Sequence, residues 1–468
     1  MAKVTFLGAA QEVTGSCHLL ESEATGRIIL DCGMHQGGDA IKRIQKDNFD
    51  FEIRDLDAVV LSHAHLDHSG LLPKLVSKGF SGPIFCTSAT ADLLRIMLND
   101  AAGIYERDLA RENLRSQRKG RKRRLRPEYT QGDVDRVLAL CQKTPYRKKV
   151  QFAPHASVTF HDAGHILGSA IVEITFTESG EDKTLVFSGD LGNKDSTLMN
   201  DPAQLDNASI VLMESTYGNR NHRDMDSTLS ELQDILKRTW ERGGNVLIPS
   251  FAVGRTQEML FHLGHLYYEG LLDPWQVFLD SPMALQVTKL YEKWLHLLDA
   301  DDVKELTDVQ KRSLQEFLPS LRISETPQES MAINEFKQGV IVIAGSGMCT
   351  GGRIRHHLKH RVWREENTLL FVGFQAGGTL GRKLVDGADR IRMFNEEFAV
   401  KAAIETLGGF SAHAGQDELV EWISGFRNNP KVALVHGEAQ SMQALSTRLD
   451  RECGISCQLP ARNEEIVF

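Results

Sequence analysis

The pattern of apolar and polar positions along the chain predicts alternating strands and helices. Short apolar runs rich in valine and isoleucine recur from the amino terminus onward, and each stops at polar or glycine-rich residues, as buried strands do. The clearest runs are 27–30, 56–61, 158–160, 170–176, 184–187 and 431–435. Longer segments between such runs have helical periodicity, so we expect an α/β protein.

The middle of the chain has its own series of strands and helices. Predicted strands at 245–249, 276–279 and 340–343 alternate with predicted helices at 255–268 and 285–297 and with one after Gly352. Such alternation indicates a small doubly wound parallel sheet inserted into a first domain. We therefore expect a first domain from 1–214 and 396–468, with the inserted domain at 215–395.

Length and composition limit the class of protein. A chain of 468 residues is long enough for two or three domains, and no apolar run is long enough to span a bilayer. The amino terminus has the pattern of a first strand and not of a signal peptide. Seven scattered cysteines without a C-x-x-C pair indicate neither a disulfide framework nor a zinc ribbon. We expect a cytoplasmic protein with no membrane partner.

The segment His63-Ala64-His65-Leu66-Asp67-His68 is the strongest chemical signal. It follows the predicted strand 56–61 and precedes a helix expected from Ser69. Histidines two apart on extended backbone point the same way, so His63 and His65 can share one cation while the turn carries Asp67 and His68 to a second. The alternative is a polar turn of no chemical use.

Three further residues of ligand type follow predicted strands elsewhere. They are His165, Asp190 and His436. Open α/β folds place their active sites at the carboxyl ends of strands, so this recurrence is what one shared site would produce. Gly189 allows a close backbone approach, and the Asp190 carboxylate can bridge two cations. Alone, Asp190 would be interpreted as a turn residue; together the residues predict one binuclear site.

The charge pattern adds candidate phosphate contacts to a chain whose formal net charge is −9. Seven of the nine residues from Arg118 to Arg126 are basic, residues 147–149 continue that charge, and 353–364 are almost free of acid. Either region could meet phosphate, or the first could be a solvated loop. The glycine-rich stretch 345–352 joins a strand to a helix, where backbone N–H groups favour an anion, better a polymer phosphate than a dinucleotide.

The metal loop and Asp31 at the end of strand 27–30 resemble the metallo-β-lactamase superfamily. The resemblance implies an αββα sandwich in which Asp31 supports the metal loop from behind. It also implies two zinc ions, with Asp190 between them. One would be held by His63, His65 and His165, and the other by Asp67, His68 and His436.

The inserted domain resembles the β-CASP family of RNA-processing nucleases, the group that includes the nuclease subunit of the cleavage and polyadenylation specificity factor. The matching segments are 213–218, 249–255, 280–284, 345–352, 409–414 and 434–438. By this resemblance Glu214, His413 and His436 occupy motifs A, B and C. A histidine in the last motif is typical of members that act on RNA, so RNA is the expected partner.

The expected chemistry is hydrolysis of a phosphodiester. Two zinc ions lower the pKa of bound water to about 7, which supplies a metal-bound hydroxide for attack with Asp67 and its neighbours as catalytic ligands. His413 is the expected general acid for the leaving oxygen, since imidazole titrates near neutral pH. Glu214 would orient His413 through a charge-assisted hydrogen bond. The alternative for Glu214 is a buried strand-end acid.

The sequence leaves more than one interpretation open for the substrate contacts and for the activity itself. Residues Ser250, Arg255, Ser346 and Arg353 lie in loops of the insertion and could contact successive phosphates, or could bond internally. The first functional hypothesis is a zinc-dependent ribonuclease. The others are a hydrolase of a small thioester or lactam and a non-catalytic RNA-binding scaffold. The sequence leaves open endonuclease against 5′-exonuclease action, the RNA that is cut, a homodimer, and whether the run 118–126 contacts RNA.

Overall fold

The computed structural model describes residues 1–35, 40–121, 124–308 and 313–468. Two of the residues in the basic run 118–126, Lys122 and Arg123, therefore lie outside the described residues. The chain divides into a first compact unit, residues 1–221 with 413–468, and a second, residues 222–412. The second unit spans 222–412, whereas the sequence predicts an inserted domain at 215–395.

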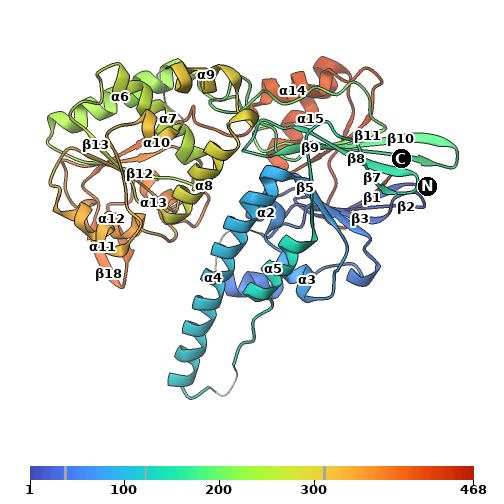
Figure 1. The fold of residues 1–468 in the computed structure, drawn as a ribbon, viewed down its shortest axis with the longest axis horizontal. Helices are drawn as coiled ribbons and strands as arrows, with labels where there is room; N and C mark the ends of the chain where they lie inside the picture. The colour runs from blue at the N-terminus through green and yellow to red at the C-terminus, as the bar shows by residue number, and fades with distance from the viewer. Residues whose placement is uncertain (36–39, 122–123, 309–312) are drawn as a thin grey trace. The chain divides into compact units, whose positions relative to one another are not determined.

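The first unit contains two seven-stranded sheets (Figure 1). The first sheet has, in spatial order, β22 (Glu465–Val467), β1 (Lys3–Gly8), β2 (Cys17–Ser22), β3 (Gly26–Leu30), β4 (Ala58–Val60), β5 (Ile84–Thr87) and β6 (Cys141–Thr144). The second has β21 (Cys457–Gln458), β20 (Lys431–Val435), β11 (Ile210–Glu214), β10 (Glu181–Phe187), β9 (Ala170–Glu178), β8 (Ala156–Asp162) and β7 (Val150–Ala153). The strands β3 to β6 are parallel neighbours, and so are β10, β11 and β20.

The core of the first unit lies between these two sheets. Alternate side chains of each strand point into it, for example Val4, Phe6 and Val60 from one sheet and Phe160 and Val172 from the other. A second cluster packs the outer face of the β20 sheet against helices α14 (Gln416–Ser424) and α15 (Ala439–Cys453). Helices α2 (Leu66–Ser69), α3 (Leu72–Ser77), α4 (Ser88–Arg118) and α5 (Gln131–Leu140) belong to the first sheet, and the expected αββα sandwich is confirmed.

The second unit is built on a six-stranded, all-parallel sheet. Its strands, in spatial order, are β14 (Leu321–Ile323), β13 (Gln276–Leu279), β15 (Val340–Ala344), β12 (Val246–Pro249), β16 (Thr368–Phe371) and β19 (Ala403–Thr406). One face is covered by α6 (Met225–Glu241), α7 (Arg255–Tyr268) and α8 (Pro282–Lys293), and the other by α12 (Ile354–Arg361) and α13 (Leu380–Val385). Helices that pack apolar side chains on both faces of the sheet confirm the doubly wound arrangement.

The other elements are short. They are α1 (Ala40–Lys46), α9 (Ala300–Asp308), α10 (Leu314–Phe317), α11 (Pro327–Ala332), the hairpin β17 (Arg390–Met393) with β18 (Glu396–Ala399), and three single-turn 3-10 helices, Ile53–Asp55, Leu295–Leu297 and Ile333–Glu335. Within the described residues, no helix is both long and apolar enough to cross a bilayer.

Two predicted boundaries were wrong for local reasons. The helix expected from Ser69 begins at Leu66, so Asp67 and His68 lie on a helical turn and not in an irregular turn. The helix expected at 285–297 runs from Pro282 to Lys293. Ser281 caps this helix by accepting a hydrogen bond from the Ala284 N–H, and proline is favoured at the first helical position.

Candidate metal centre

Four candidate ligands of the first unit follow the ends of strands in its two sheets. Residue His63 comes after β4, His165 after β8, Asp190 after β10 and His436 after β20. Strands β10, β11 and β20 are parallel neighbours, so their carboxyl ends share one edge of the sheet. His63 follows a strand of the facing sheet, and the donor groups bring it together with residues up to 373 positions away, at His436.

The first donor group consists of His63, His65, His165 and Asp190. The Nδ1 atom of His65 lies 3.1 Å from Nε2 of His63 and 3.1 Å from Nε2 of His165. Asp190 Oδ2 lies 3.6 Å from each of those Nε2 atoms. Ligands about 2.1 Å from one tetrahedral zinc are roughly 3.4 Å apart, so these four atoms have the spacing of a zinc site.

The second donor group consists of Asp67, His68 and His436. The Nε2 atoms of the two histidines are 3.1 Å apart, and Asp67 Oδ2 lies 3.9 Å from Nε2 of His436. Asp190 Oδ1 lies 3.3 Å from His68 Nε2, so the two oxygens of Asp190 face different donor groups. This Oδ1 atom is buried and has no hydrogen-bond partner among the described residues, as expected of an oxygen that serves a cation.

The protonation states of the first group and of Asp67 favour cation binding. Burial, with neighbouring His68, lowers the pKa of His63 far below its ordinary value, and burial lowers the pKa of His65 to about 4. Burial opposes ionisation of Asp67 and Asp190, but the surrounding histidines hold the pKa of both carboxyls below the ordinary value. Neutral imidazoles and ionised carboxylates are the forms that ligate zinc.

Asp31 supports the second group from behind. It is fully buried and has the left-handed backbone conformation, with φ of 60°. His68 Nδ1 donates to its Oδ2 at 2.7 Å, and the Ser62 backbone N–H donates to its Oδ1 at 2.8 Å. Burial disfavours a charged His68, but Asp190 and Asp31 raise its pKa well above the ordinary value, so cation binding at Nε2 would release a proton.

Two hydroxyl residues that the sequence reasoning missed orient the ligand rings. The Ser62 hydroxyl donates to Asp31 Oδ2 at 2.9 Å and lies 3.1 Å from His63 Nδ1, from which it can accept. The Thr216 hydroxyl lies 3.1 Å from His436 Nδ1. Each partner engages Nδ1 and leaves Nε2 toward the donor group, as second partners of zinc-binding histidines do. The only sequence signal was a hydroxyl residue beside the ligand segments.

Glu214 and His413 form a third group with Asp190. Glu214 is fully buried at the end of β11, and its Oε1 accepts from the Leu191 N–H at 2.6 Å and lies 3.2 Å from His413 Nδ1. His413 Nδ1 is also 4.0 Å from Asp190 Oδ2, and its side chain is 22% exposed. Burial disfavours the imidazolium, but Glu214, helped by Asp190 and Asp67, raises the pKa of His413 to about 9.

The four candidate substrate contacts lie in the second unit and have partners there. Arg353 Nη1 donates to Asp280 Oδ1 at 2.6 Å and to the Ser324 carbonyl at 2.9 Å. The guanidinium of Arg255 pairs with Glu258 and lies over the Phe410 ring. Hydroxyls of Ser250 and Ser346 bond within their own loops. A phosphate contact by any of the four stays a prediction.

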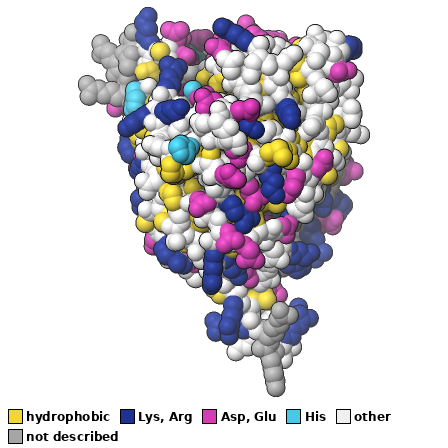
Figure 2. Space-filling model, turned by 90° about the vertical axis from the view of Figure 1, so that its right-hand side faces the viewer, with side chains coloured by type: hydrophobic (Ala, Val, Ile, Leu, Met, Phe, Trp, Pro, Cys, Tyr) yellow, Lys and Arg dark blue, Asp and Glu magenta, His cyan; other side chains and the backbone are white. Residues whose placement is uncertain are grey.

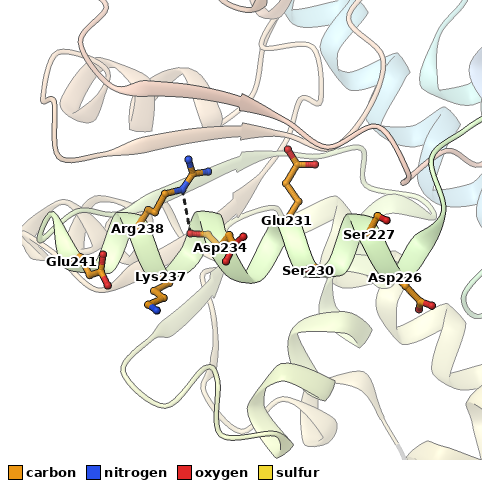
Figure 3. A pocket seen from close by; sticks show the side chains of 8 residues that line it. All are labelled: Asp226, Ser227, Ser230, Glu231, Asp234, Lys237, Arg238 and Glu241. Atoms are coloured by element: carbon orange, nitrogen blue, oxygen red, sulfur yellow. Dashed lines mark hydrogen bonds between the residues drawn. The ribbon is translucent and has the colours of Figure 1, made fainter.

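A hollow of about 890 Å³ runs along the exposed face of α6 in the second unit. Figure 3 shows charged side chains spaced along this helix, and the Arg238 Nε bonds to the Asp234 carbonyl. Its lining residues are Asp226, Ser227, Ser230, Glu231, Asp234, Lys237, Arg238 and Glu241, with no histidine or cysteine among them. It is a charged helix face and contains none of the donor groups described above.

Comparison with known proteins identifies three regions. Residues 10–250 match the metallo-beta-lactamase superfamily, residues 256–384 the Beta-Casp domain, and residues 397–460 a Zn-dependent metallo-hydrolase RNA specificity domain. The chain is 40% identical over 452 residues to ribonuclease TTHA0252 of Thermus thermophilus, covering 96% of both chains. It is 32% identical over 448 residues to transcription termination factor FttA of Methanocaldococcus jannaschii, covering 93% of this chain and 67% of that protein.

One solved structure, of a protein of unknown function from Enterococcus faecalis, has a TM-score of 0.53 and 14% identity and covers 100% of both chains. This likeness concerns the fold alone.

Proposed function

The chain belongs to the metallo-beta-lactamase superfamily, with a Beta-Casp domain and an RNA specificity domain, and from this membership we propose that it is a zinc-dependent ribonuclease. The relative of 40% identity is itself named a ribonuclease. The observation that carries the proposal is the convergence of two donor groups on Asp190, beside a histidine held by Glu214. A phosphodiesterase needs a metal pair and a leaving-group acid at one place.

We propose two zinc ions, with Asp190 shared between them. Residues His63, His65 and His165 would hold one, and Asp67, His68 and His436 the other. When bound, zinc supplies an activated water at neutral pH and neutralises phosphate charge. The support is the spacing of the donor atoms and the buried Asp190 Oδ1 without a hydrogen-bond partner among the described residues.

The protein's own residues supply the proton. Glu214 accepts the Nδ1 proton of His413 and stabilises the imidazolium, so His413 is charged at neutral pH. Its second proton, on Nε2, is the one available to the leaving ribose oxygen as the phosphorus–oxygen bond breaks. The expected products are ends with a 3′-hydroxyl and a 5′-phosphate. The Leu191 N–H donates to the same Oε1 atom of Glu214, which holds the carboxylate in place beside the imidazole.

The alternatives have less support. A hydrolase of a small thioester or lactam would not need the Beta-Casp and RNA specificity regions. A non-catalytic RNA scaffold would not need seven residues that could hold metal ions, grouped with Glu214 and His413. A homodimer and a cytoplasmic location stay predictions of the sequence; sedimentation of the purified protein tests the first.

The test uses zinc-loaded protein and one RNA labelled at either end, carrying a 5′-triphosphate or a 5′-monophosphate. We expect RNA cleavage; internal fragments would indicate an endonuclease, and mononucleotides released only from the 5′-monophosphate an exonuclease. The His413→Ala protein should lose most activity. His161→Ala is the matched control, since His161 is also a partly exposed histidine paired with a glutamate, at 2.9 Å. Thioester turnover without RNA cleavage would contradict the proposal.

A further inference from the structure

Helix α4 begins beside the metal centre and leads away from it. The hydroxyls of Thr87 and Thr90, at its amino-terminal end, each donate to the Gly168 carbonyl at 2.7 Å, three residues beyond His165. The helix continues for 31 residues to Arg118. At 1.5 Å per residue it is about 46 Å long. In Figure 1 its far end projects from the sandwich, and the chain then returns toward α5.

The returning segment is bonded to the helix. The Asn113 side chain forms two hydrogen bonds with the backbone of Leu125, at 2.8 and 3.0 Å. The Glu128 N–H donates to the Tyr105 hydroxyl at 3.1 Å, and the Tyr105 ring stacks on Tyr129. We call α4 from residue 104 to its end, with the described part of the return to residue 129, the basic arm. These contacts fix the described part of the return against the helix.

The charge at the far end of the basic arm is concentrated and not neutralised. From Asn113 to Pro127 the sequence has eight Lys or Arg residues and no acid, in a chain of net charge −9. Nearer the sandwich, Arg111 and Arg115 pair with Asp108 and Glu112 at 3.4 and 3.7 Å. Five cations further out are exposed and form no ion pair with a described residue: Arg118, Lys119, Arg121, Arg124 and Arg126. Figure 2 shows basic side chains gathered at the lower end of the molecule.

We propose that the basic arm binds the phosphate backbone of the RNA substrate at a distance from the metal centre. The inference rests on the proposed function and adds a second point of attachment to it. Unpaired arginines on an otherwise acidic protein match a polyanion, because guanidinium forks bind phosphate and release counterions. A helix of about 46 Å corresponds to roughly 13 stacked nucleotides at 3.4 Å each, so only a long RNA reaches both places.

The test compares two variants in a His413→Ala background, in which cleavage is slow. The arm variant changes Arg118, Lys119, Arg121, Arg124 and Arg126 to glutamine. The control variant removes the same charge from exposed positions elsewhere in the first unit, at Arg54, Arg427, Lys431, Arg451 and Arg462. Binding of labelled RNAs of 30 and 5 nucleotides is measured by fluorescence anisotropy at several salt concentrations, after zinc content and thermal unfolding have been matched.

We expect the arm variant to bind the 30-nucleotide RNA at least tenfold more weakly and the 5-nucleotide RNA unchanged, with the control within twofold of the parent. The salt dependence should fall by about 0.7 for each lost phosphate contact. Equal binding of the long RNA by arm variant and parent would overturn the proposal. Arm-dependent binding only to phosphatidylserine vesicles would overturn it in favour of a membrane. If RNA binding depends on the basic arm but the zinc-loaded parent protein does not cleave RNA, the proposed ribonuclease function is refuted and the role of the basic arm in RNA binding stands.

Discussion

Two buried aspartates, one in each unit, stand at the ends of parallel strands and differ in how their oxygens are satisfied. In the second unit, Asp280 accepts from His357 Nε2, Arg353 Nη1 and Ser330 Oγ, each at 2.6 Å. In the first unit, Asp190 faces four histidine nitrogens at 3.3 to 3.6 Å, and its Oδ1 accepts no hydrogen bond from a described residue.

The difference separates a structural cluster from a candidate cation site. Around Asp280 an arginine brings positive charge of its own, so the carboxylate is balanced within the unit. Around Asp190 the first group brings imidazoles that burial keeps neutral, and their nitrogens converge on each other. Histidine and aspartate at a strand end are therefore not enough to identify a metal site. Among the described residues, what distinguishes Asp190 from Asp280 is that no arginine pairs with it and that its Oδ1 accepts no hydrogen bond.

The largest expected effect comes from removing one of the metal-donor residues around Asp190. Changing His63 or Asp67 to alanine should lower kcat/KM for RNA by roughly a thousandfold or more, about 4 kcal/mol, because metal catalysis contributes several kcal/mol. Zinc content should fall with it. Steady-state cleavage assays and metal analysis measure both effects. Variants that keep full activity and full zinc content would contradict the assignment of the residues around Asp190 as metal donors.

The next effect concerns the acid beside the metal centre. His413→Ala should lower kcat about 100- to 10,000-fold with zinc content unchanged, as expected for a general acid. The acid form of His413 is present below its folded pKa of about 9 and is lost as the pH rises through that value. Glu214→Gln removes the main cause of the raised pKa, so the alkaline fall in kcat should move to lower pH. If the alkaline fall in kcat stays at the same pH in Glu214→Gln, the proposed role of the Glu214–His413 pair is contradicted.

The Asp280 cluster should respond in stability and not in metal content. Asp280→Asn weakens charge-assisted hydrogen bonds to His357 and Arg353, and we expect a loss of about 2 kcal/mol in the free energy of unfolding. Zinc content should stay at the parent value. Asp386→Asn is the control, because its pair with Arg382 is exposed and its loss should change the free energy of unfolding far less. Chemical denaturation measures the stability of both variants, and metal analysis measures their zinc content. Loss of zinc from Asp280→Asn would contradict a purely structural role for the Asp280 cluster.

The smallest effect tests a third cluster, in which His35 lies between Asp47 and Glu12 at 3.1 Å from each. These two carboxylates raise the pKa of His35 to about 9 against the opposing effect of burial. Because the folded pKa is raised, the stabilisation is complete below about pH 6.5, the ordinary value, and declines as the pH rises to about 9. Unfolding curves across this range should show the decline, and His35→Gln should reduce it.

The grouping of the proposed ligands was predictable because His63, His165, Asp190 and His436 follow strands that their own apolar runs identify. The positions of His165, Asp190 and His436 needed only the rule that parallel strands place their carboxyl ends together. The orienting roles of Ser62 and Thr216 could not be predicted, since a hydroxyl's partner depends on side-chain geometry and not on sequence spacing.

Other parts required the structure for similar reasons. The internal bonding of Arg353 depends on Asp280, 73 residues away, which no local pattern connects to it. The helical start at Leu66 lacks a side-chain cap, so no capping signal announced it. The basic run 118–126 was visible in the sequence. Only the structure shows that its first residue, Arg118, ends helix α4, that α4 begins near His165, and that Leu125 is hydrogen-bonded back to that helix.

The most direct test of the central claim is the number of zinc ions bound to each chain, measured by native mass spectrometry on the parent protein and on His436→Ala. Two donor groups that share Asp190 predict two zinc ions in the parent and one in the variant, because His436 belongs to the second group alone. One zinc ion in the parent, or two in both proteins, would contradict the account.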